Sequence, residues 1–194
     1  MDKRKIAVFV GSLREGSFNR QLARALERLG EDRLEFDHVD IGSLPFYNQD
    51  FDGDYPQEGT ALKAQVRAAD AVLFVTPEYN RSVPGVLKNA IDLASRPYGD
   101  SAFAGLPAAV IGASVGAIGT AMAQQHLRNI LSYLDMAVMP QPEAYLQFKD
   151  GLVDGDGRVT RQDTREFLED FVDRFAAWID PPRGARACAA TARW

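Results

Sequence analysis

The sequence has little of the chemistry that metal centres, disulfides and membrane insertion require. Its 194 residues include one cysteine, Cys188, and two histidines, His38 and His126. A single cysteine excludes an internal disulfide and any cysteine-based metal site, and two distant histidines do not suggest a metal centre. No apolar run approaches the roughly 20 residues of a membrane-spanning helix. We therefore expect no metal ion and no membrane partner.

Excess positive charge is also absent. The net charge is −5, and no basic face is evident, which argues against nucleic acid as a partner. The charged N-terminus runs directly into a short apolar strand, unlike a signal peptide, so we expect a cytoplasmic protein. A hydrophobic content of 46% with 25% charged residues is typical of a globular domain. We expect one domain over residues 1–180 and a flexible tail over 181–194.

What the sequence does contain is a regular alternation of strand and helix patterns. Short apolar runs predict strands over residues 5–10, 34–40, 71–75, 108–112 and 136–139. Apolar residues at helical spacing predict helices over 21–29, 59–68, 83–94, 123–134 and 163–179. The segments 41–59 and 140–158 are expected to be irregular. This alternation predicts an α/β domain with a parallel sheet covered by helices on both faces.

The first polar loop, Gly11 to Asn19, joins the first strand to the first helix. The N–H groups that open a helix are unpaired and lie at the positive end of its dipole, so they suit a phosphate. The P-loop pattern fails because Ser17 and Phe18 stand where Lys and Ser/Thr are needed, and the dinucleotide fingerprint fails because Leu13 replaces its second glycine. The loop suits one terminal monophosphate, although a merely polar surface turn remains the alternative. The candidate phosphate ligands are Ser12, Arg14, Ser17 and Asn19.

Two further polar loops follow the third and fourth predicted strands. Ligands of parallel sheets lie beyond the carboxyl ends of the strands, so the three loops should meet there. The segment Pro77 to Asn80 offers main-chain groups and Tyr79 to the rim of a flat heterocycle. The segment Ala113 to Gly119 has Ser114 as its only polar side chain, and its glycines let the backbone approach a ring. A flat polar ring with one phosphate describes FMN better than ATP.

At three motifs the chain resembles the NADPH-dependent FMN reductases, most closely their bacterial quinone and chromate reductase branch. The motifs are GSLREGSFNR, VTPEYNRSVPGVLKNAID and GASVGAIG. The resemblance implies a flavodoxin-like three-layer sandwich, with a five-stranded parallel sheet of order 2-1-3-4-5 and helices on both faces. It also implies FMN as cofactor and NADPH or NADH as co-substrate. The cofactor-binding residues that it implies are Ser12, Arg14, Ser17, Phe18, Asn19, Pro77, Glu78, Tyr79, Asn80, Ser114 and Gly116.

The resemblance also implies an activity. Hydride would pass from NAD(P)H to the flavin, and two electrons would then pass to a quinone, an azo compound, free flavin or a metal oxyanion such as chromate, with ping-pong kinetics. The cofactor carries this chemistry, so no catalytic side chain is expected, and Glu78 is assigned a structural role in preference to that of a general acid. The family forms homodimers or homotetramers. A flavodoxin-type electron carrier and a flavin-binding regulatory protein remain as alternatives.

Overall fold

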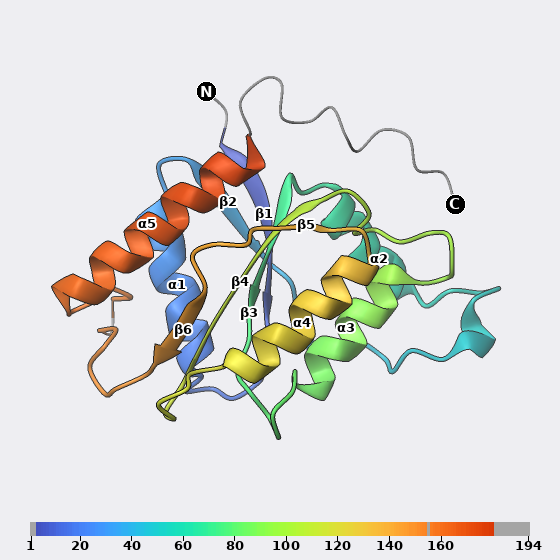
Figure 1. Ribbon diagram of the computed structural model, residues 1–194. Helices are drawn as coiled ribbons and strands as arrows, with labels where there is room; N and C mark the ends of the chain where they lie inside the picture. The colour runs from blue at the N-terminus through green and yellow to red at the C-terminus, as the bar shows by residue number, and fades with distance from the viewer. Residues whose placement is uncertain (1–2, 155, 181–194) are drawn as a thin grey trace.

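The computed structural model describes residues 3–154 and 156–180, so the predicted tail over 181–194 lies outside the described residues. One parallel sheet forms the centre of the fold (Figure 1), with strand order β2-β1-β3-β4-β5 and β6 also paired to β4. The predicted flavodoxin-like order is confirmed. The strands are β1 (Arg4–Val10), β2 (Leu34–His38), β3 (Ala71–Val75), β4 (Pro107–Ser114), β5 (Ala137–Val138) and β6 (Ala144–Gln147).

Helices cover both faces of the sheet, which confirms the three-layer sandwich (Figure 1). One face packs against α1 (Phe18–Gly30) and α5 (Gln162–Ile179). The other packs against α2 (Gln57–Arg67), α3 (Gly85–Ser95) and α4 (Ala121–Tyr133). Side chains alternate between the two faces along a strand, so Ile6 and Val8 of β1 enter one core and Ala7 and Phe9 enter the other. Within residues 3–154 and 156–180, no helix is long and apolar enough to cross a bilayer.

The fifth position of the sheet differs from the prediction. A single strand was expected over 136–139, followed by a loop, but β5 pairs with the start of β4 and β6 pairs with its end. The prediction of a loop over 144–147 was therefore wrong. Pro140 and Pro142 lie between the two strands and have no N–H to donate to a ladder, which accounts for the break. The pairing of β3 with β4 ends at Ile111, and β6 pairs with β4 from Ile111 to Ser114, so β6 keeps the end of β4 that carries the third loop within the sheet.

The first helix begins earlier than its apolar pattern indicates. Helix α1 starts at Phe18, because Ser17 caps it: the Ser17 hydroxyl oxygen accepts a hydrogen bond from the backbone N–H of Arg20, 3.2 Å away. Phe18, Asn19 and Arg20 thus occupy the first helical turn instead of the loop. The segment over 41–59, which was expected to be irregular, contains one short 3-10 helix, η1 (Gln49–Phe51), and its last three residues already belong to α2, which begins at Gln57.

Candidate functional site

The three polar loops meet at the carboxyl edge of β1, β3 and β4, which are adjacent strands. Backbone hydrogen bonds connect the starts of the loops to the neighbouring strands. The N–H of Gly11 donates to the carbonyl of Val75 at 2.9 Å, and the N–H of Thr76 donates to the carbonyl of Ile111 at 3.0 Å. Gly11 also lies close to the second loop, because a Cβ built on it would be 3.2 Å from Cδ of Pro77. The loops therefore form one continuous surface.

The first loop presents donors at the start of α1. Ser12 and Ser17 are buried, with exposed fractions of 6% and 2%. The first N–H groups of α1 have no carbonyl partner within the helix, and the helix dipole adds partial positive charge at this end. The Ser17 oxygen accepts a hydrogen bond, which leaves its own hydroxyl hydrogen available to donate. These groups fit an anion of the size of one phosphate.

Arg14 packs on the ring of Phe18, the first residue of α1. Its guanidinium carbon lies 4.5 Å from the centre of the Phe18 ring, in a cation–π contact. The Phe18 ring in turn stacks on Phe148, with 4.2 Å between ring centres. No sequence pattern indicated a role for Phe148, which follows β6 in a segment that was predicted to be a loop. Phe18 therefore supports the cation of the loop through packing.

Asn19 fastens the first loop to the third. Its side-chain amide donates to the carbonyl of Ala113 and accepts from the N–H of Ala113, both at 2.9 Å. The side chain is 3% exposed, so water does not compete for these bonds. They fix the position of α1 relative to the end of β4. A direct contact between Asn19 and the phosphate stays a prediction.

The second loop is a tight hairpin. Tyr79 and Ser82 exchange two backbone hydrogen bonds, both at 3.0 Å. The two residues of the turn, Asn80 and Arg81, have φ values of 51° and 65°, the left-handed conformation that such a two-residue turn requires. The Tyr79 side chain is 51% exposed on this hairpin. The predicted aromatic surface is thus presented on a rigid turn.

Two side chains attach this hairpin to α4. The Glu78 carboxylate accepts hydrogen bonds from the N–H groups of Met122 and Ala123, at 3.0 and 3.1 Å. Those N–H groups belong to the first turn of α4, where a negative charge is favoured. On the other side of the turn, Oγ of Ser82 lies 3.0 Å from Nδ1 of His126 on α4. The Glu78 carboxylate is thus engaged with backbone N–H groups of α4, and its structural role stays a prediction.

The third loop is closed by its own serine. The Ser114 hydroxyl donates to the carbonyl of Gly119 at 2.6 Å, which folds the loop before α4 begins. A Cβ built on Gly116 would have only the Ser114 hydroxyl within 4 Å, at 3.6 Å, so this part of the loop is open. A ring system could approach the backbone there. Direct contacts of Ser114 and Gly116 with a cofactor stay predictions.

Comparison with known proteins agrees with this geometry. A profile of the NADPH-dependent FMN reductase family matches residues 4–150. A 2-hydroxy-1,4-benzoquinone reductase from a Burkholderia species is 55% identical over 90% of this chain and 96% of its own length. A quinone reductase from Pseudomonas putida is 51% identical over 90% of this chain and 94% of its own length.

Solved structures share this fold. The flavoenzyme NAD(P)H:(acceptor) oxidoreductase FerB from Paracoccus denitrificans superposes with a TM-score of 0.88 and 49% identity, over 91% of this chain and 97% of that one. A flavodoxin from Pseudomonas aeruginosa, at a TM-score of 0.58 and 22% identity, shares the fold over 90% of this chain and 98% of its own. Since the profile matches most of the sequence and the relatives span nearly all of it, this chain belongs to the NADPH-dependent FMN reductase family.

Proposed function

We propose that this protein is an FMN-dependent NAD(P)H oxidoreductase whose acceptors are quinones. Membership of the FMN reductase family supports the cofactor, and relatives named quinone reductases support the acceptor. The observation that carries the proposal is that three loops meet at one edge of the sheet and are joined by hydrogen bonds. Asn19 bonds to Ala113, and Glu78 bonds to the first turn of α4. Such joints preorganise a site before its ligand arrives.

The residues present fit a ring system with one phosphate. Ser12, Ser17 and the first N–H groups of α1 would bind the phosphate, and Arg14 would neutralise part of its charge. Asn19 is the fourth predicted phosphate ligand, and Phe18 supports Arg14. Six further predicted residues would border the ring: Pro77, Glu78, Tyr79, Asn80, Ser114 and Gly116. When bound, FMN supplies the redox chemistry, accepting hydride from NAD(P)H and delivering two electrons to the acceptor. The protein has to hold and orient its ligands, which requires no acid–base side chain.

The proposal extends to a broad range of acceptors and to a homodimer or homotetramer. Azo compounds, free flavin and chromate are included because an exposed site selects weakly among small oxidants. Two apolar side chains of the site loops are exposed, with 51% for Tyr79 and 67% for Val115. Exposed apolar side chains at the site support contact with a second subunit.

The test is a steady-state assay of the FMN-loaded protein with NADPH or NADH and a panel of acceptors headed by a benzoquinone. We expect continuous loss of NAD(P)H absorbance, with parallel double-reciprocal plots because the two substrates react in turn. A flavodoxin-type carrier would bind FMN and leave NADPH unoxidised. Protein that failed to bind FMN on reconstitution would contradict both assignments. Light scattering of the same sample measures the number of subunits.

A further inference from the structure

A hollow lies beside the first loop, on the β2 side of β1. Its volume is about 440 Å³, within the range of roughly 300–1,000 Å³ that is usual for small-molecule sites. Ser12 and Leu13 of the first loop form part of its wall. The rest comes from α1 and from the end of β2: Val10, Arg20, Arg24, Glu27, His38, Val39, Asp40 and Ile41. None of the residues from α1 or the end of β2 was predicted as part of the flavin site.

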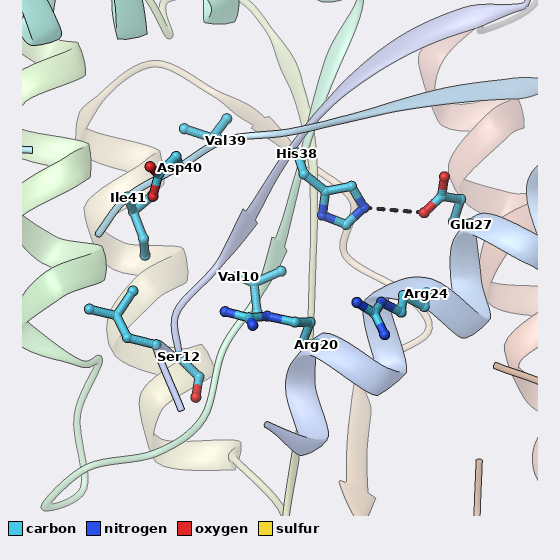
Figure 2. A pocket seen from close by; sticks show the side chains of 10 residues that line it. Val10, Ser12, Arg20, Arg24, Glu27, His38, Val39, Asp40 and Ile41 are labelled. Carbon is cyan, nitrogen blue, oxygen red and sulfur yellow. Dashed lines mark hydrogen bonds and ion pairs between the residues drawn. The ribbon is translucent and has the colours of Figure 1, made fainter. Parts of the chain in front are cut away.

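Two arginines of α1 contribute unsatisfied positive charge to this hollow. Arg20 and Arg24 are four residues apart, so they lie on the same face of the helix, one turn from each other. Figure 2 shows both side chains extending from α1 into the space below the end of β2. Neither guanidinium forms a hydrogen bond or ion pair with any residue in the ranges 3–154 and 156–180. Each can therefore offer its planar set of donors to a ligand.

The carboxylates of the hollow already have donors. Oε2 of Glu27 lies 3.2 Å from Nε2 of His38, the contact drawn as a dashed line in Figure 2. Oδ1 of Asp40 accepts a hydrogen bond from the N–H of Gly42 at 3.0 Å. Among the charged side chains of the wall, Arg20 and Arg24 are therefore those without a hydrogen bond or ion pair to the described residues, and their donors suit an anion with several acceptor oxygens. A phosphate monoester meets that requirement, since arginine binds its oxygens in a bidentate manner and the ester carries several of them.

We propose that the hollow is a second phosphate site, separate from the first loop. In it, Arg20 and Arg24 bind a phosphate monoester. It lies at the carboxyl ends of two parallel strands, where ligands of such sheets bind. The phosphate could belong to the adenosine 2′-phosphate group of NADPH or to a separate phosphorylated molecule. Both sources present the same phosphate monoester to the two arginines, and the experiment distinguishes between them.

The test uses FMN-loaded protein, so that the first loop is already filled. Inorganic phosphate and adenosine 2′-monophosphate are titrated calorimetrically, with adenosine as the phosphate-free control. We expect both phosphate probes to bind, and Arg20→Gln or Arg24→Gln to weaken binding about tenfold or more, as expected for the loss of a charged hydrogen-bond donor. Arg28→Gln is the matched control, because Arg28 lies one turn further along α1 and outside the hollow.

Kinetics identify the source of the phosphate. If the variants raise KM for NADPH and leave KM for NADH unchanged, the phosphate is that of the nucleotide. If phosphate binding is lost with both KM values unchanged, the occupant is a separate molecule. The proposal is overturned if neither probe binds, if Arg24→Gln binds them as the wild type does, or if either variant releases FMN, which would make the hollow part of the flavin site. Because binding is measured directly, failure of the reductase assay leaves this result intact.

Discussion

Gly112 of β4 lies directly against Thr76, the residue that begins the second loop. A Cβ built on Gly112 would be 2.1 Å from the carbonyl oxygen of Thr76 and 2.3 Å from Oγ1 of Thr120. Both threonines are fully buried, so neither has room to move aside. The absence of a side chain at this position lets β3, β4 and the start of α4 approach one another. The spacing of the second and third loops therefore depends on one glycine.

We expect Gly112→Ala to lose about 3 kcal/mol or more of unfolding free energy, at the upper end for an overpacked core, because the methyl group meets a backbone carbonyl. FMN affinity should fall with it, since the loops are forced apart. Gly85→Ala is the matched control: a Cβ there has nothing within 4 Å. That variant should be neutral or stabilised by up to roughly 1 kcal/mol. Urea unfolding and flavin fluorescence titration measure the two effects, and equal stability of the two variants would contradict the argument.

Asn19→Ala tests the joint between the first and third loops. The variant leaves the buried N–H and carbonyl of Ala113 without their partner, and we expect it to destabilise the protein by about 2–4 kcal/mol. FMN should bind more weakly because α1 is no longer fixed to β4. Asn129→Ala, at an exposed position of α4, should change neither quantity. Wild-type stability of the Asn19 variant in a urea titration would show that the two hydrogen bonds contribute little.

The sequence predicted those features of the site that depend on local pattern. The alternation of strands and helices placed the loops that begin at Gly11 and Thr76 at one edge, and the structure confirms that they meet there. It could not predict the partners of Asn19 and Glu78, which lie 94 and about 44 residues away, because such contacts leave no local periodicity. Strand β6 was missed because its four residues follow Pro142 and are too few to show an alternation.

Asp100 should make stability depend on pH. A hydrogen bond from Lys63, supported by Arg67, holds the pKa of Asp100 below its usual value of 3.8. A carboxyl group whose pKa is lower in the folded than in the unfolded protein stabilises the fold at pH values above the pKa of the unfolded state. This stabilisation is lost as the pH falls through the pKa of the folded state. We therefore expect Asp100→Asn to be less stable than the wild type at about pH 7, with the gap narrowing below about pH 4. Urea midpoints across this range measure the gap.

The control for Asp100 is Asp150→Asn, which changes an exposed carboxylate in the loop after β6. Its urea midpoint should follow that of the wild type at each pH. A gap between wild type and Asp100→Asn that stayed constant from about pH 7 to about pH 3 would show that the ion pair with Lys63 does not carry the dependence. No such gap at any pH would show that the pair contributes nothing to stability.

Variants of Glu78 distinguish a positioning role of this residue from a catalytic one. Glu78→Ala removes the acceptor for the N–H groups of Met122 and Ala123, which should cost about 0.5–2 kcal/mol, as for the loss of a helix cap. Glu78→Gln keeps an acceptor oxygen and loses only the charge at the helix start, worth about 0.3–1 kcal/mol. Glu31→Ala, at the exposed end of α1, is the control.

The kinetics of these variants then decide between the two roles. If Glu78 only fixes the hairpin to α4, Glu78→Gln should keep the wild-type kcat and pH profile, and Glu78→Ala should mainly raise KM, because the carboxylate is engaged with backbone N–H groups in the folded protein. A general acid would give the opposite result. Its replacement by glutamine removes the transferable proton, so kcat would fall roughly 10²–10⁴-fold and one limb of the pH profile would disappear.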